Sequence, residues 1–310
     1  MASPSRTVPE RLLAPSDEFL DDWMAAVRLG TANLRWSSVA FVGLARNCAA
    51  PLANNLSRLK KLADLCGSWC LHVETNDNAD DTVDVLRAFA ECHDQASYRD
   101  QTLGRQQFSA EFAGPRTIAL AEYRTACQAW VAENAADTDF TIVIDWDAMG
   151  GWWHDGALNS VGQLAMTPDA YAMASVSLLE HPVMAMGEDH TPTLTKGWVH
   201  YDAWALRGIG QPSCYWDAYT AGAGGWAHQW LPPVGSPPVV VASAFGGFCV
   251  YRTQDYLAAT YTGARDCEHV TAHRSIAERT GRRLYINPSC RTIMRWMDEE
   301  PADGGQHGHD

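Results

Sequence analysis

Short apolar runs and amphipathic segments alternate along the first half of the chain. Ser38–Leu44 and Trp69–Val73 are compact apolar runs rich in β-branched and aromatic residues, which is the pattern of buried strands. Each run is followed by apolar residues at helical spacing, first from Pro51 to Leu65 and then from Val83 to Phe89. Because strand and helix alternate at this spacing, the pattern predicts right-handed βαβ units and a parallel sheet.

A third apolar run ends in two aspartates. Phe140–Ile144 leads directly into Asp145, Trp146 and Asp147, after a helix predicted from Arg116 to about Glu133. Such a run suits a central strand buried on both faces, and its end places two carboxylates at the sheet edge where open α/β folds bind ligands. Two hard oxygen donors favour Mg²⁺ or Mn²⁺ carrying a diphosphate. The same residues also fit an acidic strand exit at which one aspartate caps a turn or a helix.

The second half of the chain is less periodic. Strands are predicted at Tyr171–Leu179, Trp198–Leu206 and Pro238–Ala242. Gly, Pro, Ala and Trp are frequent between 207 and 237, where we expect long ordered loops.

Tryptophans cluster close to the aspartates and beyond them. Eight of the thirteen lie between residues 146 and 230, and clustered tryptophans usually belong to a core because they bury large areas. Beside a polar site, an exposed Trp146, Trp152 or Trp153 would instead stack on a sugar ring or a nucleobase.

A glycine pair and a helix start follow in the last third of the chain. Gly246 and Gly247 mark a turn that enters a strand, and they serve either a tight turn or the close approach of backbone to a ligand. Glu268 begins a helical segment in which His269 and His273 lie one turn apart on one face. These histidines are either packed side chains or part of a site.

The two ends of the chain differ from its centre. Residues 1–15 carry three prolines and predict an extended lead-in, and the acidic and apolar spacing after them predicts an outer helix. A last short strand is predicted at Leu284–Pro288, whereas the polar tail 298–310 is predicted to be flexible. Residues 1–37 are therefore assigned to an N-terminal extension that precedes the main domain.

Composition narrows the class of protein. The 310 residues are 46% hydrophobic and 19% charged, with a net charge of −14, which describes a globular protein and speaks against broad contact with nucleic acid or anionic membranes. The nine cysteines are scattered, odd in number and without a Cys-x-x-Cys pair, which favours reduced thiols over a disulfide framework or a zinc site. The sequence shows no signal peptide and no apolar run long enough to span a bilayer. We therefore expect a soluble, cytoplasmic protein.

In their order and spacing these motifs resemble the GT-A class of nucleotide-sugar glycosyltransferases over about residues 38–291. The later part is similar to the fungal capsule mannosyltransferase type and its bacterial relatives. The motifs are Val42–Asn47, Glu74 with Asn76 and Asp77, Asn78–Thr82, Arg116, Tyr123–Arg124, Asp145–Asp147, Tyr201–Arg207, Phe245–Arg252 and Cys267–His269. Two departures are visible, namely one extra residue between Glu74 and Asn78 and a tryptophan between the two aspartates.

The resemblance implies an α/β fold with a GT-A-like, Rossmann-type sheet, mixed but mainly parallel, flanked by helices in a single large domain. Within residues 38–297 it implies a nucleotide-binding half (38–147) and an acceptor half (148–297). The implied activity is metal-dependent transfer of a hexose from a UDP- or GDP-sugar to a hydroxyl acceptor. A glycan, a lipid-linked sugar, a small molecule or a modified nucleobase would each fit as acceptor, and the resemblance tilts slightly toward retention of the anomeric configuration.

The resemblance also implies roles for individual residues. Asp145 and Asp147 would bind Mn²⁺ or Mg²⁺, with His273 as a further candidate ligand. Glu268 would be the base or the carboxylate that orients the acceptor, with His269 beside it. The residues implied to contact the donor are Arg46, Asn47, Glu74, Asn76, Asp77, Arg116, Asp145, Trp146, Gly246 and Gly247.

Two other classes stay open at the level of sequence. A nucleotidyltransferase on a related fold would want a glycine-rich, basic loop after the first strand, and Ala45–Cys48 lacks that richness. A non-catalytic carbohydrate-binding protein would use the acidic pair structurally and the tryptophans as its contact surface.

Overall fold

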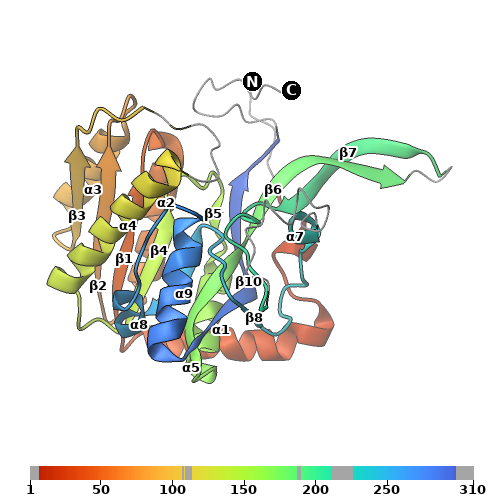
Figure 1. Cartoon of the computed structure of the whole chain (residues 1–310). Coiled ribbons are helices and arrows are strands. Elements are labelled where there is room, and N and C mark those ends of the chain that lie inside the picture. Colours follow the sequence, from red (N-terminus) through yellow and green to blue (C-terminus); the bar gives the residue numbers. More distant parts are fainter. Residues whose placement is uncertain (1–6, 107, 109–113, 187–189, 211–225, 298–310) are drawn as a thin grey trace.

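A ten-stranded sheet with helices on both faces forms the body of the molecule (Figure 1). The computed structural model describes residues 7–106, 108, 114–186, 190–210 and 226–297, so the predicted flexible tail lies outside the described residues. Among those residues, no helix combines the length and the apolar composition needed to cross a membrane.

The ten strands of the described residues all belong to one mixed sheet. They are β1 (Ser38–Ala45), β2 (Ser68–Asn76), β3 (Ala96–Gln101), β4 (Phe140–Asp145), β5 (Gly151–Trp152), β6 (Ala170–Met186), β7 (Pro192–His200), β8 (Val239–Val241), β9 (Phe248–Arg252) and β10 (Arg283–Arg295). The helices are α1 (Leu20–Leu34), α2 (Ala49–Ala63), α3 (Thr82–Cys92), α4 (Pro115–Asn134), α5 (His154–Met166), α7 (Trp226–Gln229), α8 (Thr253–Leu257) and α9 (Glu268–Thr280). Two short 3-10 turns, η1 (Glu10–Leu12) and η2 (Asp17–Phe19), precede α1.

The strand order is β3-β2-β1-β4-β9-β6-β10-β5, with β7 paired to β6 and β8 to β10. β3, β2, β1 and β4 pair in parallel. β9 runs antiparallel to both β4 and β6, so β6 has the direction of β4, and β10 is parallel to β6. Six of the ten strands in the described chain therefore share one direction. This confirms the predicted fold, a mixed and mainly parallel sheet flanked by helices in one domain.

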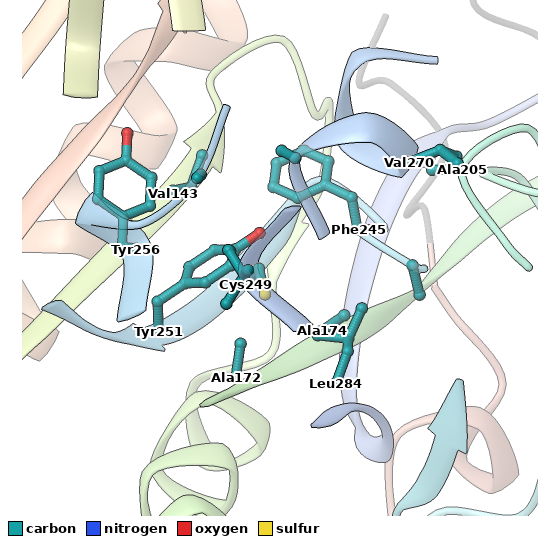
Figure 2. Close-up of a cluster of buried hydrophobic side chains, with 14 of the residues drawn as sticks. Val143, Ala172, Ala174, Ala205, Phe245, Cys249, Tyr251, Tyr256, Val270 and Leu284 are labelled. Atoms are coloured by element: carbon teal, nitrogen blue, oxygen red, sulfur yellow. The ribbon is translucent and has the colours of Figure 1, made fainter. Parts of the chain in front are cut away.

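Two hydrophobic cores lie on opposite faces of the sheet. Apolar residues of α1, α2, α3 and α5 pack on one face, and those of α4, α8 and α9 pack on the other. β4 contributes to both because successive side chains of a strand alternate between faces. Ile142 and Ile144 enter the first core and Val143 enters the second, where Figure 2 shows it among Tyr251, Tyr256 and neighbouring side chains.

The predicted outer helix is present as α1, which packs on α5 through close backbone contact. A side-chain carbon at Gly30 would lie 1.8 Å from the carbonyl oxygen of Leu158, and one at Gly162 would lie 2.0 Å from that of Ala26. Glycine is required at this crossing because any larger residue would separate the two helices.

Several elements differ from the predicted ones. The strand predicted at Trp198–Leu206 is wrong beyond its first residues, since β7 ends at His200 and turns follow. β10 continues to Arg295, well past the predicted end at Pro288, through an irregular register between Ile286 and Arg291. β3 and α5 had no predicted counterpart.

The hairpin of β6 and β7 extends beyond the body of the molecule and returns the chain to the sheet (Figure 1). Its far end pairs Met184 with Leu194, and both side chains are largely exposed. At its near end, Leu178 pairs with His200. The return strand therefore delivers Tyr201 and the loop after it to the middle of the sheet.

Candidate active site

The polar strand ends predicted to meet are brought to one edge of the sheet. In the register of the three central strands, Leu44 of β1 lies beside Asp145 of β4 and Ala45 lies beside Thr75 of β2. Arg46 and Asn76 continue from these positions at the same edge. The carboxyl ends of parallel strands meet there, where open α/β sheets bind ligands.

The predicted glycine turn borders the first aspartate. The Asp145 N–H donates to the carbonyl oxygen of Gly247 at 2.9 Å, and Ile144 pairs with Phe248. Gly246 and Gly247 have φ values of +70° and +81°, which favour glycine. A side-chain carbon at Gly246 would lie 2.2 Å from the Ser175 carbonyl oxygen, so close packing of the backbone already requires this glycine.

β4 ends at Asp145, and Asp147 follows two residues later in the turn after the strand. The Asp145 side chain is 25% exposed, and Asp147 is exposed. Partial loss of hydration raises the pKa of the Asp147 carboxyl to about 6, and the negative charge of Asp145 adds to the shift. Two carboxylates that repel each other in this way form a donor set that a divalent cation stabilises.

Trp146 points the other way. Its side chain is fully buried and belongs to the core beneath α1, α2 and α5. It meets Trp152 edge-on, with ring centroids 6.4 Å apart, and Gly43 makes room for it because a side-chain carbon there would lie 2.7 Å from its Nε1. This corrects the prediction that Trp146 contacts the donor, because a wholly buried indole cannot touch a bound molecule.

A buried arginine joins the site, and no role was predicted for it. Arg124 of α4 is only 4% exposed; its Nη2 donates to Asp145 Oδ1 at 2.6 Å, and its Nε lies 3.8 Å from Glu268 Oε1. Its guanidinium carbon lies 5.0 Å from the centre of the Phe245 ring. Since an arginine stays charged, this residue fixes Asp145 in place and balances two carboxylates. The only signal in the sequence was its place in the Tyr123–Arg124 motif.

Glu268 and His269 begin α9 and lie next to this arginine. Glu268 is 2% exposed, and burial raises its pKa while Arg124 opposes the shift. His269 stacks on Phe245, with ring centroids 3.9 Å apart, and burial lowers its pKa well below the usual value. Neither ring nitrogen has a hydrogen-bond partner in the part of the chain that the structure describes. The site therefore holds a buried carboxyl and a neutral imidazole side by side.

His273 lies one turn further along α9, inside the core. Ser243 Oγ lies 2.9 Å from its Nδ1 and the Tyr251 hydroxyl lies 2.7 Å from its Nε2. Burial lowers its pKa to about 3. Because both ring nitrogens already have partners, His273 is a core residue in this structure and is not retained as a metal ligand.

The predicted nucleotide-binding residues of β2 have internal partners. Glu74 is 5% exposed, and its two oxygens pair with His72 Nε2 and Arg99 Nε, each at 2.9 Å. Its carboxylate is therefore not available to a nucleotide in this structure. Asn76 donates to Asp77 at 2.8 Å.

Asp77 and the residues after β1 organise the loops at this edge. Asp77 Oδ1 accepts the N–H groups of Leu103 and Gly104, each at 2.9 Å, and the Asn76 hydrogen bond together with these N–H groups lowers its pKa to about 2. Arg46 donates to the Arg105 carbonyl oxygen at 2.8 Å, and Asn47 accepts from the Ala79 N–H at 2.7 Å. These contacts tie three loops together around the edge of the sheet.

A second missed group comes from the loop after β7. Asp202 Oδ2 accepts the Gly246 N–H at 2.8 Å. Its neighbour Tyr201 is 46% exposed, and burial and then the charge of Asp147 raise the tyrosine's pKa to about 12. Arg116, which lies over the Trp204 ring at 5.1 Å, also influences Tyr201. Residues from the predicted acceptor half thus meet the two aspartates.

The described residues fit a cation that the protein only partly surrounds. No group of three or more His, Cys, Asp or Glu side chains in the described ranges is gathered closely enough to hold a metal ion. Asp145 and Asp147 would supply two oxygens, which suits Mg²⁺ or Mn²⁺ bound jointly by a protein and the phosphates of a substrate.

The chain is similar to solved structures only at low sequence identity. No family model and no curated protein matches the chain. Among solved structures, it is similar to a mannosyltransferase of Pyrobaculum calidifontis in complex with GDP-Man and Mn²⁺, at 12% identity and a TM-score of 0.46, over 89% of this chain and 66% of that one. It is also similar to the glucosyl-3-phosphoglycerate synthase of M. tuberculosis, at 12% identity and 0.45, over 93% and 80%.

A third structure, GalNAc-T7 with UDP, GalNAc and Mn²⁺, matches at 10% identity and a TM-score of 0.47, over 95% of this chain and 57% of that one. The chain thus spans less than two thirds of the length of GalNAc-T7. At these identities and scores, function has to be argued from the residues of this chain.

Proposed function

We propose that this protein is a metal-dependent glycosyltransferase that moves a hexose from a UDP- or GDP-sugar to a hydroxyl acceptor. The observation that carries the proposal is the pair Asp145 and Asp147 at the end of a central strand. One carboxylate is held by the buried Arg124 and the other is exposed with a raised pKa. This arrangement supports a site that becomes stable when a cation and a diphosphate enter it together.

Different residues bind the donor and the acceptor in this proposal. When bound, Mn²⁺ or Mg²⁺ neutralises the diphosphate of the leaving nucleotide. Arg124 orients Asp145 for this purpose, and Arg46 and Arg116 lie at the same edge as cations for phosphate oxygens. In this proposal residues 38–147 bind the nucleotide and residues 148–297 bind the acceptor. The likeness to the fungal capsule type and the cytoplasmic location stay predictions.

The test is calorimetry with UDP and with GDP, each in the presence and absence of Mn²⁺. We expect one nucleotide to bind only when Mn²⁺ is present, because the acidic pair repels a bare diphosphate. A screen of nucleotide sugars for slow hydrolysis then identifies the donor. Metal-independent binding, or no binding of either nucleotide, would contradict the proposal and favour a non-catalytic protein.

The pH dependence of metal binding provides a further prediction. The pKa of Asp147 is raised from 3.8 to about 6, so the folded protein keeps a proton there, and the stability that this proton contributes is lost as the pH rises through about 6. A cation replaces the proton. We therefore expect Mn²⁺ to raise the melting temperature more at about pH 8 than at about pH 5.

Thermal unfolding of the unchanged protein with and without Mn²⁺ measures this difference. In the matched variant Asp147→Asn, the Mn²⁺ effect should be small at both pH values, because one of the two proposed metal ligands is gone. An equal Mn²⁺ effect at both pH values in the unchanged protein would show that the cation binds elsewhere.

A further inference from the structure

Asp202 is held rigidly at the border between the two halves of the site. Its N–H donates to Ser177 Oγ at 2.9 Å, on the neighbouring strand β6. Its carboxylate accepts two backbone N–H groups, that of Gly246 at 2.8 Å and that of Ala205 at 3.3 Å. A carboxylate anchored at both oxygens and at its own backbone has a fixed direction, as a group that acts on a substrate requires.

Two hydrogen bonds connect this carboxylate to the predicted metal site. Asp202 Oδ2 accepts from Gly246, and the carbonyl oxygen of the next residue, Gly247, accepts the Asp145 N–H. The adjacent residues Gly246 and Gly247 thus link Asp202 to Asp145 through one hydrogen bond each. Asp202 therefore lies close to the cation site without being a neighbour of its ligands in the sequence.

Asp202 is better placed than Glu268 to meet an acceptor. Glu268 is 2% exposed and faces the guanidinium of Arg124, so an incoming hydroxyl would have to displace a buried ion pair. Asp202 is half-buried and stands next to the exposed Tyr201. Asp202 is therefore more accessible to an acceptor than Glu268 is.

The charges around Asp202 favour a proton acceptor that works near neutral pH. Burial raises its pKa to about 7; the Gly246 and Ala205 N–H groups lower it, whereas Asp145 of β4 and Glu268 of α9 raise it. Tyr201 of the same loop and Cys267 before α9 also interact with Asp202. A carboxylate tuned toward the working pH both takes up and releases a proton readily.

We propose that Asp202 is the catalytic base that takes the proton of the acceptor hydroxyl. The inference rests on the proposed sugar transfer. In that step the acceptor oxygen forms a bond to the anomeric carbon, and its proton passes to an Asp202 oxygen. The bond from that carbon to the diphosphate oxygen breaks, and its electron pair leaves with the nucleoside diphosphate.

The substitution Asp202→Asn tests this assignment, because an amide oxygen still accepts the Gly246 N–H while the base is lost. The reaction to follow is hydrolysis of the donor found by the screen, with water as acceptor. We expect kcat to fall about 10²- to 10⁴-fold, while Mn²⁺-dependent nucleotide binding by calorimetry stays within about twofold, since the metal ligands are untouched.

The pH profile separates a base from a residue that only positions the turn. At saturating Mn²⁺ and donor, where metal binding at Asp147 no longer limits the rate, kcat of the unchanged protein should rise with pH along a limb with its midpoint at or below about 7, because a bound cation offsets the charge of Asp145 and lowers the pKa of Asp202. This limb should vanish in Asp202→Asn and persist in Glu268→Gln and in Asp202→Glu, which keeps a carboxylate. Melting temperatures verify that each variant is folded.

Three results would overturn the assignment. A retained limb in Asp202→Asn, or a rate close to that of the unchanged protein, would show that another group takes the proton. A loss of Mn²⁺-dependent nucleotide binding in that variant would make Asp202 part of the metal site. If the unchanged protein itself binds no nucleotide with Mn²⁺, the proposed transfer fails and the inference fails with it.

Discussion

Replacing Asp147 with alanine is expected to abolish Mn²⁺-dependent nucleotide binding and to lower the rate of sugar transfer by at least about 10³-fold. The side chain is exposed and its removal leaves Asp145 and Arg124 paired. The lost carboxylate is the one that is not paired with Arg124. Calorimetry with the nucleotide and Mn²⁺, together with the rate of donor hydrolysis, measures both effects.

The fold should be unaffected, which makes the variant informative. We expect the melting temperature without metal to be unchanged or higher, because the repulsion between Asp147 and Asp145 is removed. Asp84→Ala is the matched control, since it removes an exposed carboxylate that pairs with Arg87 on α3 and should change neither binding nor rate. Aggregation or unfolding of Asp147→Ala would mean that this aspartate has a structural role instead.

Replacing Trp146 with alanine is expected to destabilise the protein by about 3–5 kcal/mol, the range for truncating a large buried aromatic side chain. The indole is fully buried and fills the space that Gly43 leaves open beside Trp152. Equilibrium unfolding in urea measures the loss. Where enough folded variant remains, nucleotide affinity should change little, because the indole belongs to the core beneath α1, α2 and α5, whereas Asp145 pairs with Arg124 of α4 on the other face of the sheet.

Trp36→Ala is the matched control, because Trp36 is 90% exposed and truncation at such a surface position changes stability by no more than about 0.5 kcal/mol. A small stability loss for Trp146→Ala combined with weaker nucleotide binding would return Trp146 to the donor pocket. The pair of variants therefore decides between the two roles considered for this residue.

Local periodicity predicted the nucleotide-binding half well. β1, β2 and β4 were predicted within a few residues of their observed bounds, since each is a compact apolar run that both cores bury. α2, α3 and α4 carry regular apolar spacing and were predicted too. β3 was missed because Ala96–Gln101 is polar and only partly buried at the sheet edge, so its sequence lacks the apolar signal of a strand.

The second half was harder because its local signals conflict with the tertiary structure. Asn287 and Pro288 are typical of a turn, yet β10 passes through them with an irregular register and continues. α5 contains Gly156 and Gly162, which lower helix propensity. Side-chain carbons there would lie 2.3 Å from the Ser289 carbonyl oxygen and 2.0 Å from that of Ala26. The close packing of α5 against its neighbours therefore requires glycine at both positions, although glycine weakens the helix.

The sequence by itself determined that two carboxylates end a buried central strand, and that the ends of β1 and β2 meet them at one edge. Strand alternation and parallel register are local rules, and they hold over six or eight residues of chain. The sequence did not decide where Trp146 points, because β4 ends at Asp145 and the burial of the indole depends on the helices that cover that face of the sheet.

Only the tertiary structure decided which polar side chains are available to bind a ligand. Glu74 and His273 have partners that satisfy them, whereas Arg124 and Asp202 join the aspartates from distant segments. The ion pair of Arg124 with Glu268 links α4 to α9, and the bond from Asp202 to Gly246 links two loops that are 44 residues apart. Pairings over such separations leave no periodic trace in the sequence, because they are set by the packing of whole elements rather than by neighbouring residues.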